Sequence, residues 1–119
     1  MKYMLMIHQG TTPTPLDPAA WATLSEDEQQ AIYAAYNTIN ATPGVTPGNG
    51  LQPPETATTV RVADGKTIAT DGPFVDTKES LNGYLIYDAD DLDAAIELAA
   101  QIPAARLGGA IEVRPIQEW

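Results

Sequence analysis

The sequence predicts a ferredoxin-like α+β fold, in which the elements follow the order β-α-β-β-α-β and a β-hairpin is inserted after the second strand. Three observations lead to this prediction. Strand-like segments alternate with two amphipathic helical segments along the chain. The segments 2–8 and 84–87 carry apolar side chains on both faces, as strands in the middle of a sheet do. The dipeptide Asp64-Gly65 lies between two strand-like runs, which indicates a tight hairpin turn.

The first part of the chain predicts a strand, a loop and a helix. Residues 2–8 form the strand, and residues 9–18 form a surface loop because a glycine and three prolines interrupt regular structure. Ser25 and Glu28 are spaced as a capping box, in which each side chain accepts from the backbone N–H of the other residue. The helix that they start ends at Pro43-Gly44. Its buried stripe is expected to consist of Ile32, Ala35, Tyr36 and Ile39.

The middle of the chain predicts the inserted hairpin and a central strand. Residues 44–54 are rich in glycine and proline, so we expect a loop with at most a short strand. Residues 56–62 and 66–70 favour strand structure and pair as the hairpin. The apolar and aromatic run 84–87 forms a further strand, which we expect beside the first one.

The last part of the chain predicts a helix and a strand. Asp90 is expected to cap the helix, and Pro103 ends it. Its inward stripe is expected to consist of Leu92, Ala95, Ile96 and Ala99. Residues 103–107 add a helical turn, and the alternating pattern of 110–116 predicts a half-buried strand.

Length and composition are typical of a single soluble domain. The chain has 119 residues, of which 44% are hydrophobic, so we expect one domain over residues 1–119. Sixteen acidic and six basic residues give a formal net charge of -10, which disfavours binding to nucleic acid. The absence of cysteine fits a cytoplasmic protein. The apolar run near the N-terminus is too short to span a bilayer, so we expect no membrane association.

The two-sided apolar character of 2–8 and 84–87 predicts a partner for the sheet. Two helices cover only one face, so the other face needs a second cover. A symmetric homodimer, with two copies of the sheet packed face to face, is the simplest cover. A large apolar ligand or a different protein partner is the alternative.

The stretch 70–79 joins two predicted strands and concentrates charged side chains around a turn. A structural role explains Asp71-Gly72-Pro73, because the aspartate can accept from backbone N–H groups and the proline restricts the chain. In the functional alternative, the fixed turn holds Asp71 at the mouth of the sheet as a general base or a ligand-orienting group. Lys78 follows the turn and is either a solvated residue or an anchor for an anionic substrate.

The other candidate site residues are His8, Tyr36 and Tyr84. His8 is the single histidine of the chain and is either a packed side chain or a general acid or base, since an ordinary pKa of about 6.5 suits proton transfer. Tyr36 and Tyr84 are expected as core or interface aromatics that can also present a hydroxyl to a substrate. The sequence shows no metal-ligand spacing and no glycine-rich phosphate loop, so we expect neither a metal nor a cofactor.

Several motifs together resemble a known family. The run Thr70-Asp71-Gly72-Pro73-Phe74-Val75-Asp76-Thr77-Lys78-Glu79, followed by Leu81 and Gly83-Tyr84, resembles the signature of the DGPF-type, YCII-related proteins. Further matches are Met1-Lys2-Tyr3-Met4-Leu5, Gly50-Leu51-Gln52-Pro53-Pro54, Thr58-Thr59-Val60 and Glu112-Val113-Arg114-Pro115. The resemblance covers nearly the whole chain, and it implies a dimeric α+β barrel built from ferredoxin-like subunits.

The resemblance implies less about function. Related YCII proteins have been proposed as enzymes because a histidine and an aspartate face a cleft, but their histidine lies on the first helix. Here that helix carries Tyr33 and Tyr36, so His8 would have to replace the histidine from a different element. Members of the DGPF group also tend to occur beside extracytoplasmic-function (ECF) sigma factors, which implies a regulatory link through protein contact.

Two main hypotheses of function follow, and the residues do not decide between enzyme and non-enzyme. In the first, the protein is a small-molecule enzyme that uses Asp71 with His8 for proton transfer, in a pocket between the sheet and the first helix or at the dimer seam. In the second, it is a non-catalytic metabolite-binding or regulatory module that acts with a protein partner such as an ECF sigma factor. A structural dimer without a small-molecule role is the third alternative.

Overall fold

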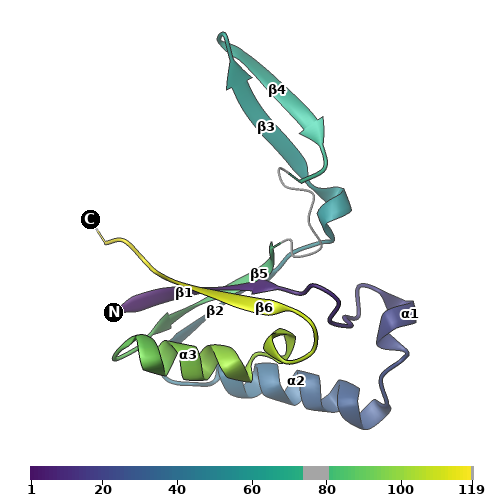
Figure 1. The fold of residues 1–119 in the computed structure, drawn as a ribbon, viewed down its shortest axis with the longest axis vertical. Helices are drawn as coiled ribbons and strands as arrows, with labels where there is room; N and C mark the ends of the chain where they lie inside the picture. The colour runs from purple at the N-terminus through teal and green to yellow at the C-terminus, as the bar shows by residue number, and fades with distance from the viewer. Residues whose placement is uncertain (74–80, 119) are drawn as a thin grey trace.

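The computed structural model of the chain describes residues 1–73 and 81–118 and shows an α+β fold (Figure 1). In chain order the elements are β1 (Lys2–His8), α1 (Pro18–Trp21), α2 (Glu26–Asn40), β2 (Val45–Gly50), β3 (Thr58–Ala63), β4 (Lys66–Asp71), β5 (Leu81–Asp88), α3 (Leu92–Gln101) and β6 (Ala110–Pro115), with short 3₁₀ turns at Pro54–Thr56 and Pro103–Ala105. The predicted elements are therefore present, and β2 is the short strand expected within the loop 44–54.

The main sheet has the strand order of a ferredoxin-like fold. Its order is β2-β5-β1-β6, and all three neighbouring pairs are antiparallel. In the register, Leu5 of β1 lies opposite Leu85 of β5 and Val113 of β6. The helices α2 and α3 lie together on one side of this sheet (Figure 1). The predicted ferredoxin-like fold with an inserted hairpin is thus confirmed.

The hydrophobic core fills the space between the sheet and these helices. Side chains alternate along β1, so that Tyr3, Leu5 and Ile7 are buried under the helices, whereas Met4, Met6 and His8 are half-buried on the other face. The core also includes Ile39, Leu85, Ala95, Leu98, Ala99 and Ile102. The opposite side of the sheet, which we call the open face, is only half-buried and contains Met4, Met6, Tyr84 and Ile86.

The capping box that begins α2 is present as predicted. The Ser25 side chain accepts from the Glu28 backbone N–H at 3.1 Å, and the Glu28 carboxylate accepts from the Ser25 N–H at 3.0 Å. The hydrogen bond from the Ser25 backbone N–H is the main cause that lowers the pKa of the Glu28 carboxyl group. Within the stripe of α2, Ile32 and Ile39 are buried and Tyr36 is half-buried. Among the described residues, no helix combines the length and apolar composition needed to cross a membrane.

The prediction for α3 was wrong in its cap and in part of its buried stripe. The cap is Asp91 instead of Asp90, since the Asp91 carboxylate accepts from the Ala94 N–H at 2.8 Å. Leu92 and Ile96 were expected to face inward but are 49% and 50% exposed, whereas Leu98 is 5% exposed. Apolar residues surround most of this helix, so periodicity alone left the inward face ambiguous.

One short helix was missed in the predicted loop 9–18. α1 begins at Pro18, and the Asp17 carboxylate accepts from the Ala20 backbone N–H at 3.3 Å. An aspartate at the cap position followed by proline at the first helical position is a favourable start for a helix. The Asp17-Pro18 pair was therefore a usable signal for a helix.

The inserted hairpin of β3 and β4 is confirmed and projects away from the main sheet (Figure 1). Asp64 and Gly65 have positive φ angles of 51° and 74°, as a two-residue turn between antiparallel strands requires. At the base of the hairpin, the Gly72 N–H donates to the Ala57 carbonyl at 2.7 Å, and the Thr59 hydroxyl donates to the Gly72 carbonyl at 2.8 Å. These bonds hold the start of the predicted turn, while Lys78 lies outside the described residues.

Candidate functional site

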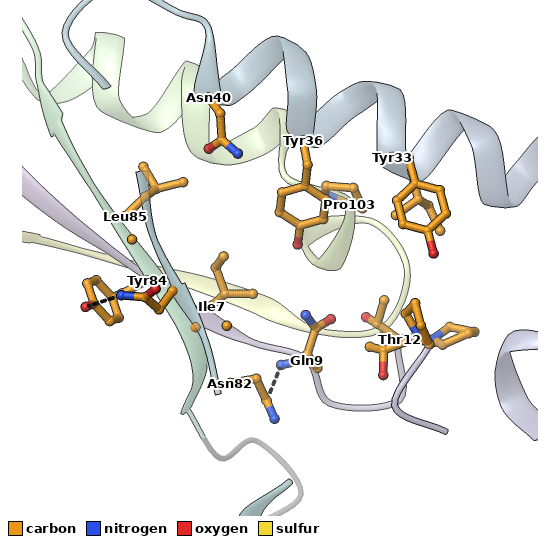
Figure 2. Close-up of a pocket in the computed structure, with 18 of the residues that line it drawn as sticks. Ile7, Gln9, Thr12, Tyr33, Tyr36, Asn40, Asn82, Tyr84, Leu85 and Pro103 are labelled. Carbon is orange, nitrogen blue, oxygen red and sulfur yellow. Dashed lines mark hydrogen bonds between the residues drawn. The ribbon is translucent and has the colours of Figure 1, made fainter. Parts of the chain in front are cut away.

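A cavity of about 280 Å³ lies between α2 and one end of the main sheet (Figure 2). We call it the α2 cavity. Its walls come from the loop after β1, from α1 and α2, from the end of β2 and from the start of β5. The location matches the predicted pocket between the sheet and the first long helix.

The loop after β1 is held in place beside β5. The Gln9 backbone N–H donates to the Asn82 side-chain oxygen at 2.9 Å (Figure 2), and the Thr12 N–H donates to the Gln9 carbonyl at 2.9 Å. Gly10 adopts a positive φ of 58° in this turn, a conformation that favours glycine. The turn places Thr12 in the cavity wall, where its side chain is buried.

Aromatic side chains from two helices line the cavity next to this loop. Tyr33 and Tyr36 extend from α2 toward the loop (Figure 2), and Trp21 comes from α1. The rings of Trp21 and Tyr33 meet edge to face, with centroids 5.6 Å apart and planes at 65°. The Gln29 side-chain amide donates to the Trp21 carbonyl at 3.0 Å, which ties the short α1 to α2.

The edge strand β2 closes the cavity on another side. Its pairing with β5 shifts register between Pro47 and Gly50, and Gly48, Asn49 and Gly50 in this irregular part of the strand line the cavity. Gly48 lies against Tyr84, and a Cβ added there would overlap the Tyr84 carbonyl oxygen. The Asn49 amide also donates to the Tyr84 hydroxyl at 3.3 Å (Figure 2).

The described lining of the α2 cavity carries no carboxylate, imidazole, amine or guanidinium group. Its polar groups are amides, hydroxyls and phenols, for example those of Asn40, Thr14 and Tyr36. Burial raises the pKa of Tyr36 above its ordinary value, and a hydrogen bond with the Gln9 side chain opposes part of this shift. The phenol is therefore protonated at neutral pH, and the described wall is electrically neutral.

The structure brings together two of the five predicted site residues. Tyr36 and Tyr84 are both among the residues that line the α2 cavity, but the Tyr84 ring lies on the open face and points away from Tyr36 (Figure 2). His8 and Asp71 are not among the lining residues. Asp71 is exposed at the end of β4, at the base of the projecting hairpin. Lys78 lies outside the described residues. The predicted catalytic roles of Asp71 and His8 stay predictions.

His8 has a carboxylate partner on the open face. Its Nε2 atom lies 3.3 Å from the Glu112 carboxylate, which also forms an ion pair with Arg114. The hydrogen bond from Arg114 is the main cause that lowers the pKa of Glu112, and the hydrogen bond with His8 adds to it. Because Glu112 stays ionised near neutral pH, its carboxylate can orient the imidazole of His8.

The prediction missed most of the polar residues that line the cavity. Gln9 and Thr12 lie in a segment that we expected to be a surface loop, and Asn82 lies between Leu81 and Gly83 of the family signature. A usable signal was the run of hydroxyl and amide side chains directly after a buried strand. In the described ranges, histidine, aspartate and glutamate side chains do not gather in a group that could hold a metal ion.

Comparison with known proteins agrees with the signature found in the sequence. An uncharacterised protein of Rhizobium meliloti (strain 1021) is 42% identical over 67 residues, which are 56% of this chain. The chain spans about half the length of that relative, since the match covers 54% of it. The family model of the YCII-related domain matches residues 1–119, and the chain therefore belongs to the YCII-related family.

Proposed function

We propose that this protein binds a small molecule in the α2 cavity without transforming it chemically. The observation that carries the proposal is the cavity itself, because its described wall combines aromatic rings with uncharged hydrogen-bonding groups. Binding sites for small molecules are concave, mostly apolar and provided with a few polar groups that orient the ligand. A neutral wall of this kind supports recognition better than catalysis.

Proton transfer in this cavity lacks a suitable side chain within the described lining. A general acid or base works best when its pKa lies near the working pH. The titratable lining groups are tyrosines, and burial moves the pKa of Tyr36 further from neutrality. The non-catalytic alternative, a metabolite-binding or regulatory module, therefore has more support than an enzyme acting at this site.

A second candidate function is the proton-transfer enzyme that uses Asp71 with His8. The contact between His8 and Glu112 favours it, since a carboxylate beside an imidazole is a common way to orient a general base. This chemistry would take place on the open face and not in the α2 cavity. It would also need Asp71 to approach the open face from the base of the hairpin.

Binding of a neutral fluorescent probe tests the first proposal. We expect 1-aminoanthracene to bind the protein saturably with an increase in its fluorescence, because the α2 cavity offers an aromatic and mostly apolar site. Asn40 points from α2 toward the sheet (Figure 2), so Asn40→Trp should fill the entrance and weaken binding at least about ten-fold. A fluorescence titration measures both affinities.

The matched control for this titration is Asn37→Trp. Asn37 is exposed on the same helix and does not line the cavity, so its replacement should leave the affinity unchanged. If the wild type and both variants bind 1-aminoanthracene with equal affinity, the probe binds outside the α2 cavity, which would contradict the proposal. Chromatography of a metabolite mixture after incubation tests the non-catalytic part, since consumption of a bound compound would support the enzyme candidate instead.

We also propose that the open face forms a homodimer, as the family resemblance implies. The half-buried apolar residues Met4, Met6 and Ile86 lie on this face, which the described helices leave uncovered (Figure 1). Ile86→Lys should shift the protein from dimer to monomer in sedimentation velocity, because a charge would be buried at the seam. Ile96→Lys on the exposed side of α3 is the matched control and should stay dimeric. A monomeric wild type would contradict this proposal.

The association with an ECF sigma factor stays a prediction from the family resemblance. The chain carries a formal net charge of -10, so such a link would act through protein contact and not through DNA. A ligand that binds the α2 cavity would then act as the signal that the dimer transmits to its partner.

A further inference from the structure

We propose that the ligand of the α2 cavity is an uncharged compound with one to three fused aromatic rings and a polar group that pairs with the Thr12 hydroxyl. This inference rests on the proposed binding function and names the class of ligand. Three properties of the described wall carry it: the size of the cavity, the neutrality of its lining and one buried hydroxyl without a hydrogen-bond partner.

Size and wall chemistry limit the ligand to a compact ring compound. A volume of about 280 Å³ lies at the small end of ligand pockets, which span roughly 300–1,000 Å³. Trp21, Tyr33 and Tyr36 form an aromatic wall on the helix side. Rings gain from edge-to-face and offset contacts with such a wall, whereas a flexible polar chain would lose its hydration for little return.

The charge of the surroundings selects against ions. An anion would enter a protein with a formal net charge of -10 and would find no cationic side chain among the described lining residues. A cation would be attracted over a long range but would find no carboxylate in the same lining. The faces of the aromatic rings would attract a cation, but more weakly than removal from water without a partner of opposite charge disfavours it, so a neutral molecule fits best.

Thr12 supplies the polar contact. It is 9% exposed, and its hydroxyl oxygen is buried in the wall without a hydrogen-bond partner among the described residues, so a rotation of the side chain is needed to present it to the ligand. Two other polar groups around the cavity already have partners, since the Asn82 oxygen accepts from the Gln9 N–H and the Asn49 amide donates to the Tyr84 hydroxyl. A buried hydroxyl without a partner is unfavourable, so a ligand group that pairs with it gains affinity. The Thr12 hydroxyl can both donate and accept, which suits an amide or a hydroxyl.

A series of three probes of the same shape and different charge tests the neutrality of the ligand. Benzamide is neutral, benzoate is an anion and benzamidinium is a cation at neutral pH. We expect benzamide to displace 1-aminoanthracene at concentrations at least about ten-fold lower than benzoate or benzamidinium, because only benzamide enters without losing ionic hydration. Equal or stronger displacement by either ion would overturn the inference.

The Thr12→Val variant tests the polar contact, with toluene as the apolar counterpart of benzamide. The variant should bind benzamide about five-fold more weakly, because valine keeps the shape of threonine and loses the hydroxyl. Its affinity for toluene should not change. Thr67→Val on the exposed hairpin is the matched control and should change neither affinity. If Thr12→Val has the same ratio of benzamide to toluene affinity as the wild type and a lower melting temperature, the hydroxyl serves the fold alone. That result would overturn the proposed contact between the ligand and Thr12.

The experiments separate failure of the inference from failure of the proposed function. If 1-aminoanthracene does not bind the wild type in a way that Asn40→Trp weakens, the binding function and the inference both fail. If the probe binds in the α2 cavity but the charge series shows no preference for benzamide, the binding function holds and only the ligand class is wrong.

Discussion

Replacement of Leu5 by alanine is expected to lower the free energy of unfolding by about 2–5 kcal/mol. Leu5 is 0% exposed in the middle of β1, where it lies opposite Leu85 on one side and Val113 on the other. The shorter side chain loses apolar burial and leaves a hole that a closely packed core fills only in part. Denaturation with urea, followed by circular dichroism, measures the loss.

Leu92→Ala is the matched control for this prediction. Leu92 is 49% exposed at the start of α3, so the same change in side-chain size removes little buried surface there. We expect a loss of less than about 1 kcal/mol, as for a surface substitution. Equal losses for the two variants would mean that Leu5 does not occupy the centre of the core.

The second large effect is expected at Gly48, where alanine should damage both stability and ligand binding. A Cβ at this position would overlap the Tyr84 carbonyl oxygen and lie 2.7 Å from the Tyr84 ring. The β2 backbone would have to move away from β5, at a cost of about 1–3 kcal/mol. Since Gly48 and Tyr84 both line the α2 cavity, the same movement would change its shape. We therefore expect Gly48→Ala to unfold at lower urea concentration and to bind 1-aminoanthracene more weakly.

Gly50→Ala separates this steric effect from the general effect of replacing glycine. Gly50 lies at the end of the same strand and also lines the cavity, but no atom lies within 4 Å of an added Cβ. The free energy of unfolding of Gly50→Ala should therefore stay within about 1 kcal/mol of that of the wild type. If Gly48→Ala behaved like Gly50→Ala in both assays, the close approach of β2 to Tyr84 would not be needed for the cavity.

The elements that the sequence predicted best depend on short-range patterns. Alternation in β1, the capping box of Ser25 and Glu28, and the Asp64-Gly65 turn each involve residues that are neighbours along the chain. The order of these elements was sufficient to predict the ferredoxin-like sheet, because few arrangements bury both helices on the same sheet.

The inward face of α3 shows where a short-range pattern was not sufficient. Apolar residues occur around most of the helix, so its periodicity predicted burial of Leu92 and Ile96 although the structure buries Leu98. The contact with the sheet and with the turn at Pro103–Ala105 selected the face, and that contact depends on residues distant in sequence.

The candidate site depended on tertiary structure most of all. The sequence by itself determined the fold, the family signature around Asp71 and the candidates Tyr36 and Tyr84. Only the tertiary structure placed Gln9, Thr12 and Asn82 around one cavity and left Asp71 and His8 outside its lining. The physical reason is that a strand end, a helix and an edge strand meet there through contacts between distant segments. Local sequence patterns report which face of an element is apolar, but they do not report which side chains will share a space.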